Sequence, residues 1–228
     1  MKIRELGLVL LMCLTAAACT EKKHDGQYFF DLAKGYIESN ELPKAVDAYS
    51  KCIELSPQLP KPYAARGTVW LKMNQNDKAI EDFSKAIQLA PNVSSLYLLR
   101  AGAFMEKKDY PGAIADYGAM IKLNPKDARA YFSLGTAYYE QGKLEEAIDP
   151  LSEAINIVPD NSQFYYARGG IFSQMGEKEM ALDDFNKAIQ LDPKNPEPYY
   201  QRAAIYGGMG DKAKEAEDEA KFRSLGGK

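Results

Sequence analysis

Residues 162–195 read SQFYYARGGIFSQMGEKEMALDDFNKAIQLDPKN, and the pattern in this stretch decides the fold. Its positions 4 and 11 are aromatic, position 20 is alanine and position 32 is proline. Prolines with the same 34-residue spacing run along the chain: Pro57, Pro91, Pro125, Pro159 and Pro193. A constant period of this length is typical of a protein built from stacked helical repeats.

Taking each of these prolines as position 32 divides the chain into six segments of one pattern. They are residues 26–59, 60–93, 94–127, 128–161, 162–195 and 196–228. Positions 4, 8 and 11 form one stripe at helical spacing and positions 20, 24 and 27 form a second, which predicts two helices per segment. Position 15, between the stripes, is asparagine or glycine in five segments and Lys108 in the third. Asparagine and glycine tolerate the left-handed conformation that ends a helix.

The period and its aromatic, alanine and proline positions over residues 26–228 resemble the tetratricopeptide repeat. The resemblance implies an all-α solenoid of about six antiparallel helix pairs that stack as a right-handed superhelix. Most of the stretch Asp211–Lys221 in the last segment is charged. A terminal repeat has no neighbour to cover it, so we expect residues 196–228 to end in a polar capping helix.

Arginine at position 7 and aspartate at position 23 occur together in four segments. The pairs are Arg66 with Asp82, Arg100 with Asp116, Arg168 with Asp184, and Arg202 with Asp218. The first and fourth segments have leucine at position 7 and lack the aspartate. We expect an ion pair between the two helices of each such segment, bidentate where the geometry allows. These arginines are then engaged within the fold rather than available to a ligand.

Pro150 replaces that aspartate in the fourth segment, inside the second expected helix. Proline removes one helical hydrogen bond and either kinks a helix or destabilises it by about 3 kcal/mol. We therefore expect a local bend in the superhelix at Pro150 or a late start of that helix.

The first 18 residues differ in composition from the repeats. Lys2 and Arg4 precede an apolar run over residues 6–14, and small residues then lead into Cys19. A run of this length is typical of a secretory signal and is shorter than the ~20 residues of a membrane-spanning helix. We expect residues 1–18 to be a signal peptide.

Small residues followed by Cys19 and a polar stretch resemble the lipobox of bacterial lipoproteins, although Ala16 stands where that family most often has leucine. The resemblance implies that Cys19 becomes the lipidated amino terminus and that residues 19–25 form a tether of at most roughly 25 Å. Thr20 follows the cysteine where aspartate would imply inner-membrane retention. We therefore expect the protein to be anchored in the inner leaflet of the outer membrane, facing the periplasm. Cleavage after Ala18 without lipidation, which gives a secreted periplasmic protein, is the alternative.

The tetratricopeptide resemblance also implies a concave wall made of the first helices, with positions 2, 5, 9, 12 and 13 facing it. Apolar side chains at positions 5 and 12 make a candidate partner-binding groove: Leu71, Leu98, Met105, Phe132, Tyr139, Tyr166 and Tyr200. Aromatic residues beside small ones can accept an extended peptide or a helix of a partner. The alternative is that position 5 packs between adjacent segments.

Composition limits the classes of function. Lysine and arginine total 29 against 32 acidic residues, and the net charge of −3 argues against nucleic acid as the partner. His24 is the only histidine, and no metal-ligand spacing, nucleophile–base pair or phosphate-binding loop stands outside the repeats. We expect no metal, no cofactor and no catalytic residues. The expected function is a non-enzymatic adaptor that binds other envelope proteins and reaches the membrane through its lipid, and a cell-wall hydrolase is the alternative.

Overall fold

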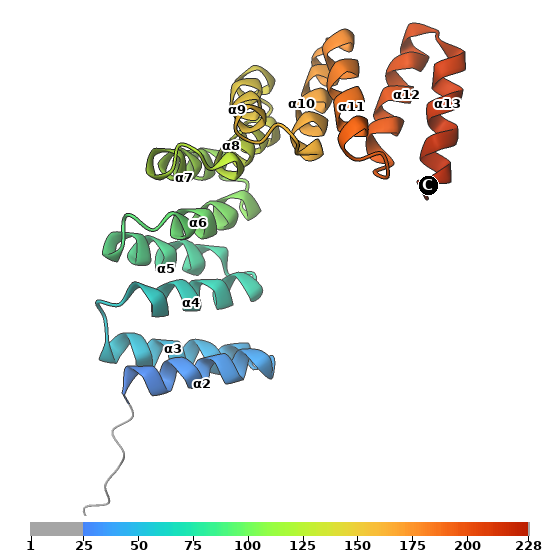
Figure 1. Ribbon diagram of the computed structural model, residues 1–228. Coiled ribbons are helices and arrows are strands. Elements are labelled where there is room, and N and C mark those ends of the chain that lie inside the picture. Colours follow the sequence, from blue (N-terminus) through green and yellow to red (C-terminus); the bar gives the residue numbers. More distant parts are fainter. Residues whose placement is uncertain (1–24, 228) are drawn as a thin grey trace, which may run out of the picture.

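The computed structural model describes residues 25–227, and this part of the chain consists of twelve α-helices without strands (Figure 1). In chain order they are α2 (Gly26–Glu38), α3 (Leu42–Leu55), α4 (Pro60–Lys72), α5 (Asn76–Leu89), α6 (Ser94–Glu106), α7 (Tyr110–Leu123), α8 (Ala128–Glu140), α9 (Leu144–Ile157), α10 (Ser162–Met175), α11 (Lys178–Leu191), α12 (Glu197–Met209) and α13 (Lys212–Ser224). Consecutive helices form antiparallel pairs, which we number repeats one to six. The expected all-α solenoid of six repeats is confirmed.

The turn inside each repeat is made by one residue in the left-handed conformation. Gly142, Gly176 and Gly210 have φ values of 81° or 82°, and Asn40 and Asn74 have φ near 60° at the same repeat position. Lys108 is neither residue type, yet its φ is 58°. A side chain with a Cβ in this conformation costs roughly 1–2 kcal/mol. The packing of α6 against α7 therefore imposes the turn on Lys108.

Small residues allow the two helices of a repeat to approach closely. The alanine at position 20 is fully buried in each of the first five repeats: Ala45, Ala79, Ala113, Ala147 and Ala181. At position 8 of repeat two, a Cβ added to Gly67 would lie 2.7 Å from Cε1 of Phe83. Gly67 is thus required for α4 to lie against the Phe83 ring of α5.

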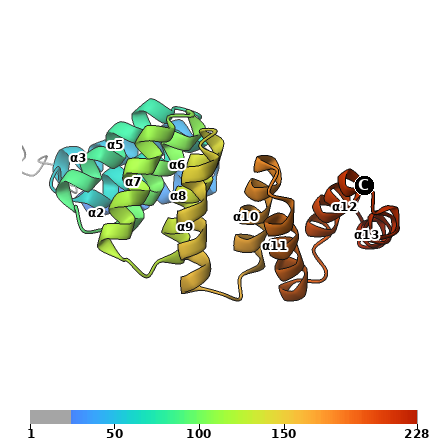
Figure 2. The same ribbon diagram turned by 90° about the horizontal axis from the view of Figure 1, so that it is seen from above.

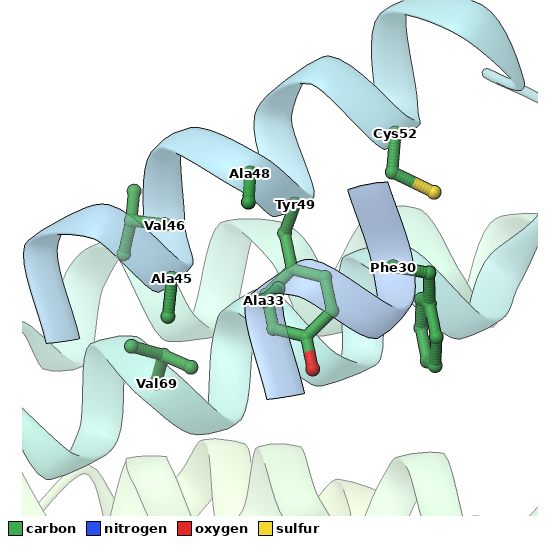
Figure 3. Close-up of a cluster of buried hydrophobic side chains, with 8 residues drawn as sticks. All are labelled: Phe30, Ala33, Ala45, Val46, Ala48, Tyr49, Cys52 and Val69. Carbon is green, nitrogen blue, oxygen red and sulfur yellow. The ribbon is translucent and has the colours of Figure 1, made fainter. Parts of the chain in front are cut away.

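The core is continuous from one repeat to the next. Figure 3 shows a buried cluster in which Ala33 of α2 and Tyr49 of α3 lie close to Val69 of α4 in the following repeat. Cys52 belongs to this cluster and is a free, buried thiol. Because each repeat packs on its neighbours, stability is shared between adjacent repeats along the row.

The repeats form an extended, curved row (Figures 1 and 2). Helices α2 to α6 lie in successive layers, and α10 to α13 continue the row in a different direction. Within residues 25–227, no helix combines the length and the apolar character needed to cross a bilayer.

Helix α9 contains Pro150 and still begins at Leu144, the position at which the second helix of the other repeats begins. The late start, one of the two outcomes expected from Pro150, is therefore wrong, and the bend stays a prediction. Ala147 and Leu151 on either side of the proline are almost completely buried. Their packing keeps the helix continuous despite the lost hydrogen bond.

Candidate functional site

A hollow of about 340 Å³ lies between the first helices of repeats four and five, α8 and α10. Three of the aromatic residues expected in the groove line it, namely Phe132 and Tyr139 of α8 and Tyr166 of α10. Gly170 lies among them, and a Cβ added there would meet no atom within 4 Å. The missing side chain therefore leaves open space beside the aromatic rings.

Each aromatic ring in the hollow is held by a neighbour. The Phe132 ring packs on Phe164 of the next repeat with centroids 5.1 Å apart, and Tyr166 packs on Phe185 at 6.0 Å. The Tyr139 hydroxyl accepts a hydrogen bond from Nε2 of Gln174 across the hollow. Rings fixed in this way lose little conformational entropy on binding a partner.

The polar groups around the rings are almost all neutral. Gln163, Gln174 and Gln201 contribute amides, and Glu140 is the single charged residue in the lining. The Thr136 hydroxyl already donates to the carbonyl oxygen of Phe132 at 2.9 Å. A neutral wall of aromatic rings and amides is suited to apolar side chains and to the amide groups of a peptide backbone.

The other residues expected in the groove lie outside this hollow. Tyr200 is 52% exposed and packs on Phe222 of α13, with ring centroids 5.1 Å apart. Leu71 packs against the buried cluster around Phe83, and Met105 packs against the cluster around Tyr117. Leu98 is exposed on α6. The structure thus gathers Phe132, Tyr139 and Tyr166 and separates the remaining four.

Three glutamines of the hollow were not among the residues expected from the sequence. Gln163 and Gln174 occupy positions 2 and 13 of repeat five, which are groove-facing positions of the repeat pattern. The groove prediction rests on apolar side chains at positions 5 and 12, so it does not include polar residues at positions 2 and 13. Gln201 occupies position 6, where the pattern does not predict a groove-facing side chain.

The four arginines at position 7 bind the aspartates with which the sequence pairs them. Arg66 donates from Nε to Asp82 Oδ2 at 2.8 Å and from Nη2 to Oδ1 at 2.7 Å. The other three pairs repeat this bidentate geometry, with distances of 2.6 to 2.9 Å: Arg100 with Asp116, Arg168 with Asp184, and Arg202 with Asp218. All four aspartates are buried. The hydrogen bonds to Asp82 raise the pKa of Arg66, against the opposing effect of burial.

Each of these arginines also reaches the preceding repeat. Nη1 of Arg66 donates to Ser50 Oγ at 2.8 Å, and Nη1 of Arg100 donates to Ser84 Oγ at 2.9 Å. Ser152 and Asn186 take the same place for Arg168 and Arg202. All four acceptors stand at position 25 of the repeat before the arginine. One guanidinium therefore joins three helices from two repeats.

Repeat four lacks all three members of this arrangement. Its position 7 is Leu134, its position 23 is Pro150, and position 25 of the preceding repeat is Gly118. Leu134 packs against the buried cluster that contains Tyr117 and Ala137. The junction between repeats three and four is therefore joined by apolar packing in place of an ion pair.

Comparison with known families identifies the repeat. A model described as "TPR repeat" matches residues 101–142, 135–176 and 169–210, and one described as "Tetratricopeptide repeat" matches residues 60–93. The chain belongs to the tetratricopeptide repeat (TPR) family. No curated protein matches this TPR chain significantly.

Solved TPR structures share the fold. MamA from Desulfovibrio magneticus superposes with a TM-score of 0.66 at 20% identity, covering 74% of this chain and 95% of that chain. YrrB, described as a TPR protein with an unusual peptide-binding site, has a TM-score of 0.64 at 18% identity, with coverages of 79% and 93%. PilF of Pseudomonas aeruginosa has a TM-score of 0.67 at 16% identity, with coverages of 88% and 91%. At these identities the likeness establishes the common fold.

Proposed function

We propose that this TPR protein is a non-enzymatic adaptor that holds a peptide segment of a partner protein in the hollow between α8 and α10. The observation that carries the proposal is the grouping of Phe132, Tyr139 and Tyr166 around about 340 Å³ of open space. Large, rigid aromatic side chains provide most of the binding energy at protein interfaces. The peptide-binding site named for YrrB supports the same use of this fold.

The charge pattern favours a neutral, partly apolar segment. The lining carries neutral amides and the single carboxylate of Glu140. The conspicuous arginines, such as Arg168 on the hollow-forming helix α10, are already bound to buried aspartates. An apolar side chain of the partner can occupy the space beside Gly170 while amides such as Gln174 bind its backbone.

The proposed localisation of the protein is the bacterial cell envelope. Cys19 lies outside the described residues, as do the signal peptide and most of the tether over residues 19–25. The support for anchoring comes from the sequence, in which small residues lead from an apolar run into Cys19. On this proposal the protein is attached to the inner leaflet of the outer membrane, faces the periplasm and assists the assembly of an envelope complex.

Site-specific photocrosslinking in intact cells tests the groove. A benzoylphenylalanine at Tyr166 lies in the hollow, and the same group at exposed Lys85 on α5 lies outside it. We expect a distinct partner to be crosslinked from position 166 and to be absent from the products of position 85. Identical products at the two positions, or none at position 166, would contradict the groove proposal.

Metabolic labelling with palmitate tests the anchor separately. The wild-type protein should take up label, and Cys19→Ser should not. A wild-type protein without label would leave the adaptor function intact and would favour the secreted form.

A further inference from the structure

The first helices of repeats two and three, α4 and α6, have an apolar residue at the N-cap position just before the helix begins. Leu59 precedes α4 and Val93 precedes α6, and neither forms a side-chain cap. At the same position of the following repeats, Asp127 and Asn161 accept a hydrogen bond from the helix backbone. Polar caps stabilise helix starts, so the first two inter-repeat loops lack a hydrogen bond that would stabilise the start of the next helix.

The apolar side chains at these loops are also exposed. Leu55, at the end of α3, is 54% exposed, Leu59 is 53% exposed and Val93 is 43% exposed. Folding gains little from such residues, because the hydrophobic effect rewards only the area that is removed from water. We call these three residues the loop edge. Its composition serves neither capping nor core packing, which points to contact with another apolar phase.

The loop edge lies on the side of the molecule at which α2 begins. A Cβ added to Gly26, the first residue of α2, would lie 2.8 Å from Ser56 Oγ, next to Leu55. In Figure 1 the loops between α3 and α4 and between α5 and α6 lie on the same side as the start of α2. A tether from Cys19 to Asp25 spans at most roughly 25 Å. An anchor at Cys19 therefore holds this side of the molecule next to the bilayer.

The charges close to the loop edge balance. Lys51, Glu54 and Lys61 are exposed on the flanking helices, and Asp25 is exposed at the N-cap position of α2. Balanced charge gives little attraction to anionic headgroups, so contact with the bilayer must come from the apolar side chains.

We propose that the loop edge inserts Leu55, Leu59 and Val93 into the surface of the bilayer and so fixes the orientation of the superhelix. The proposal rests on the membrane anchoring proposed above. The row of repeats turns away after α6, and the later loops carry the polar caps Asp127 and Asn161 (Figure 1). Repeats one to three then lie along the membrane, and the hollow between α8 and α10 is held away from it.

Tryptophan quenching by brominated lipid tests this orientation. The full-length protein is reconstituted into neutral phosphatidylcholine vesicles with and without dibrominated acyl chains, and flotation of the same samples reports membrane attachment. Leu59→Trp and Val93→Trp place the probe on the loop edge, and Gln75→Trp places it at the opposite turn, before α5. Trp70, the single natural tryptophan, lies near that opposite turn and sets the background.

We expect brominated lipid to remove fluorescence from the Leu59→Trp and Val93→Trp proteins and to leave Gln75→Trp at the wild-type level. Circular dichroism should show equal helix content in all variants. Flotation with equal quenching at positions 59 and 75, or with none at either, would overturn the loop-edge proposal and leave the anchor standing. A protein that does not float would overturn the anchor and the loop-edge proposal together, while the groove function is judged by its own crosslinks.

Discussion

Arg168 donates a hydrogen bond from Nη1 to Ser152 Oγ at 2.9 Å, and this contact joins repeat five to repeat four. The same guanidinium binds both carboxylate oxygens of Asp184 at 2.8 Å. Three of its nitrogens are thus engaged by groups on α9 and α11, while its own backbone is in α10. The arrangement fixes the spacing between repeats as well as the spacing between the two helices of one repeat.

A double-mutant cycle on Arg168 and Asp184 measures this coupling. Arg168→Met and Asp184→Asn should each lower the free energy of unfolding by on the order of 3 kcal/mol, because each leaves a buried partner without its counter-charge. The double variant should lose less than the sum of the two single losses. Urea unfolding provides the measurement, and additive losses would show that the pair does not act as a unit. Ser152→Ala is the matched control and should cost about 1–2 kcal/mol, since it removes the hydrogen bonds that the hydroxyl forms with Arg168 and with the Ile148 carbonyl oxygen and leaves the ion pair in place.

The junction between repeats three and four is apolar and lacks the arginine, aspartate and serine found at other junctions. It should tolerate these three residues only when all of them are introduced together. Leu134→Arg alone should destabilise the protein by on the order of 3 kcal/mol, since it places an unpaired guanidinium where Leu134 now packs. Adding Gly118→Ser and Pro150→Asp should restore most of that loss in thermal unfolding. Gly118 has room for the new side chain, because an added Cβ meets no atom within 4 Å. A triple variant as unstable as Leu134→Arg would refute this account of the junction.

A substitution in the hollow should mainly weaken partner capture, and a substitution in the core should mainly lower stability. Tyr166→Ala should weaken capture strongly and cost only about 1 kcal/mol of stability through its ring contact with Phe185. Phe172→Ala, inside the buried cluster against which Tyr166 packs, should lower the free energy of unfolding by about 3–5 kcal/mol through a cavity. Pull-down from envelopes and thermal melting measure the two effects.

Tyr200→Ala is the matched control for Tyr166→Ala, because Tyr200 shares its repeat position and lies outside the hollow. We expect it to leave capture nearly unchanged. Equal loss of capture in the two variants would place the binding surface elsewhere on the concave wall.

A substitution that adds a polar cap to α4 should raise the stability of the protein. Leu59→Asn should stabilise the protein by roughly 0.5–1 kcal/mol, because an asparagine at this position can accept a hydrogen bond from the start of α4. Asn161→Leu, the reverse change before α10, should destabilise it by a similar amount. Chemical unfolding of the two variants checks the pair. A destabilised Leu59→Asn protein would mean that Leu59 contributes to packing in spite of its exposure.

The sequence by itself determined the helix pairs, the division into six repeats and the aspartate partners of the four arginines. A strict 34-residue period places the same residue types on the same helix face in every repeat, and this local geometry depends only on spacing along the chain. The tertiary structure alone decided how the faces of neighbouring repeats meet. Leu71, Met105 and Tyr139 share position 12 and each packs against a buried cluster, yet Tyr139 alone among the three also lines the hollow.

The physical reason is that contact across repeats depends on the size of side chains from several helices at once. The pairing of Arg168 with Ser152 and the left-handed turn at Lys108 likewise arise from packing between elements. A repeat pattern specifies which side chains share a face, and the space left between two faces is set only when the whole row has assembled.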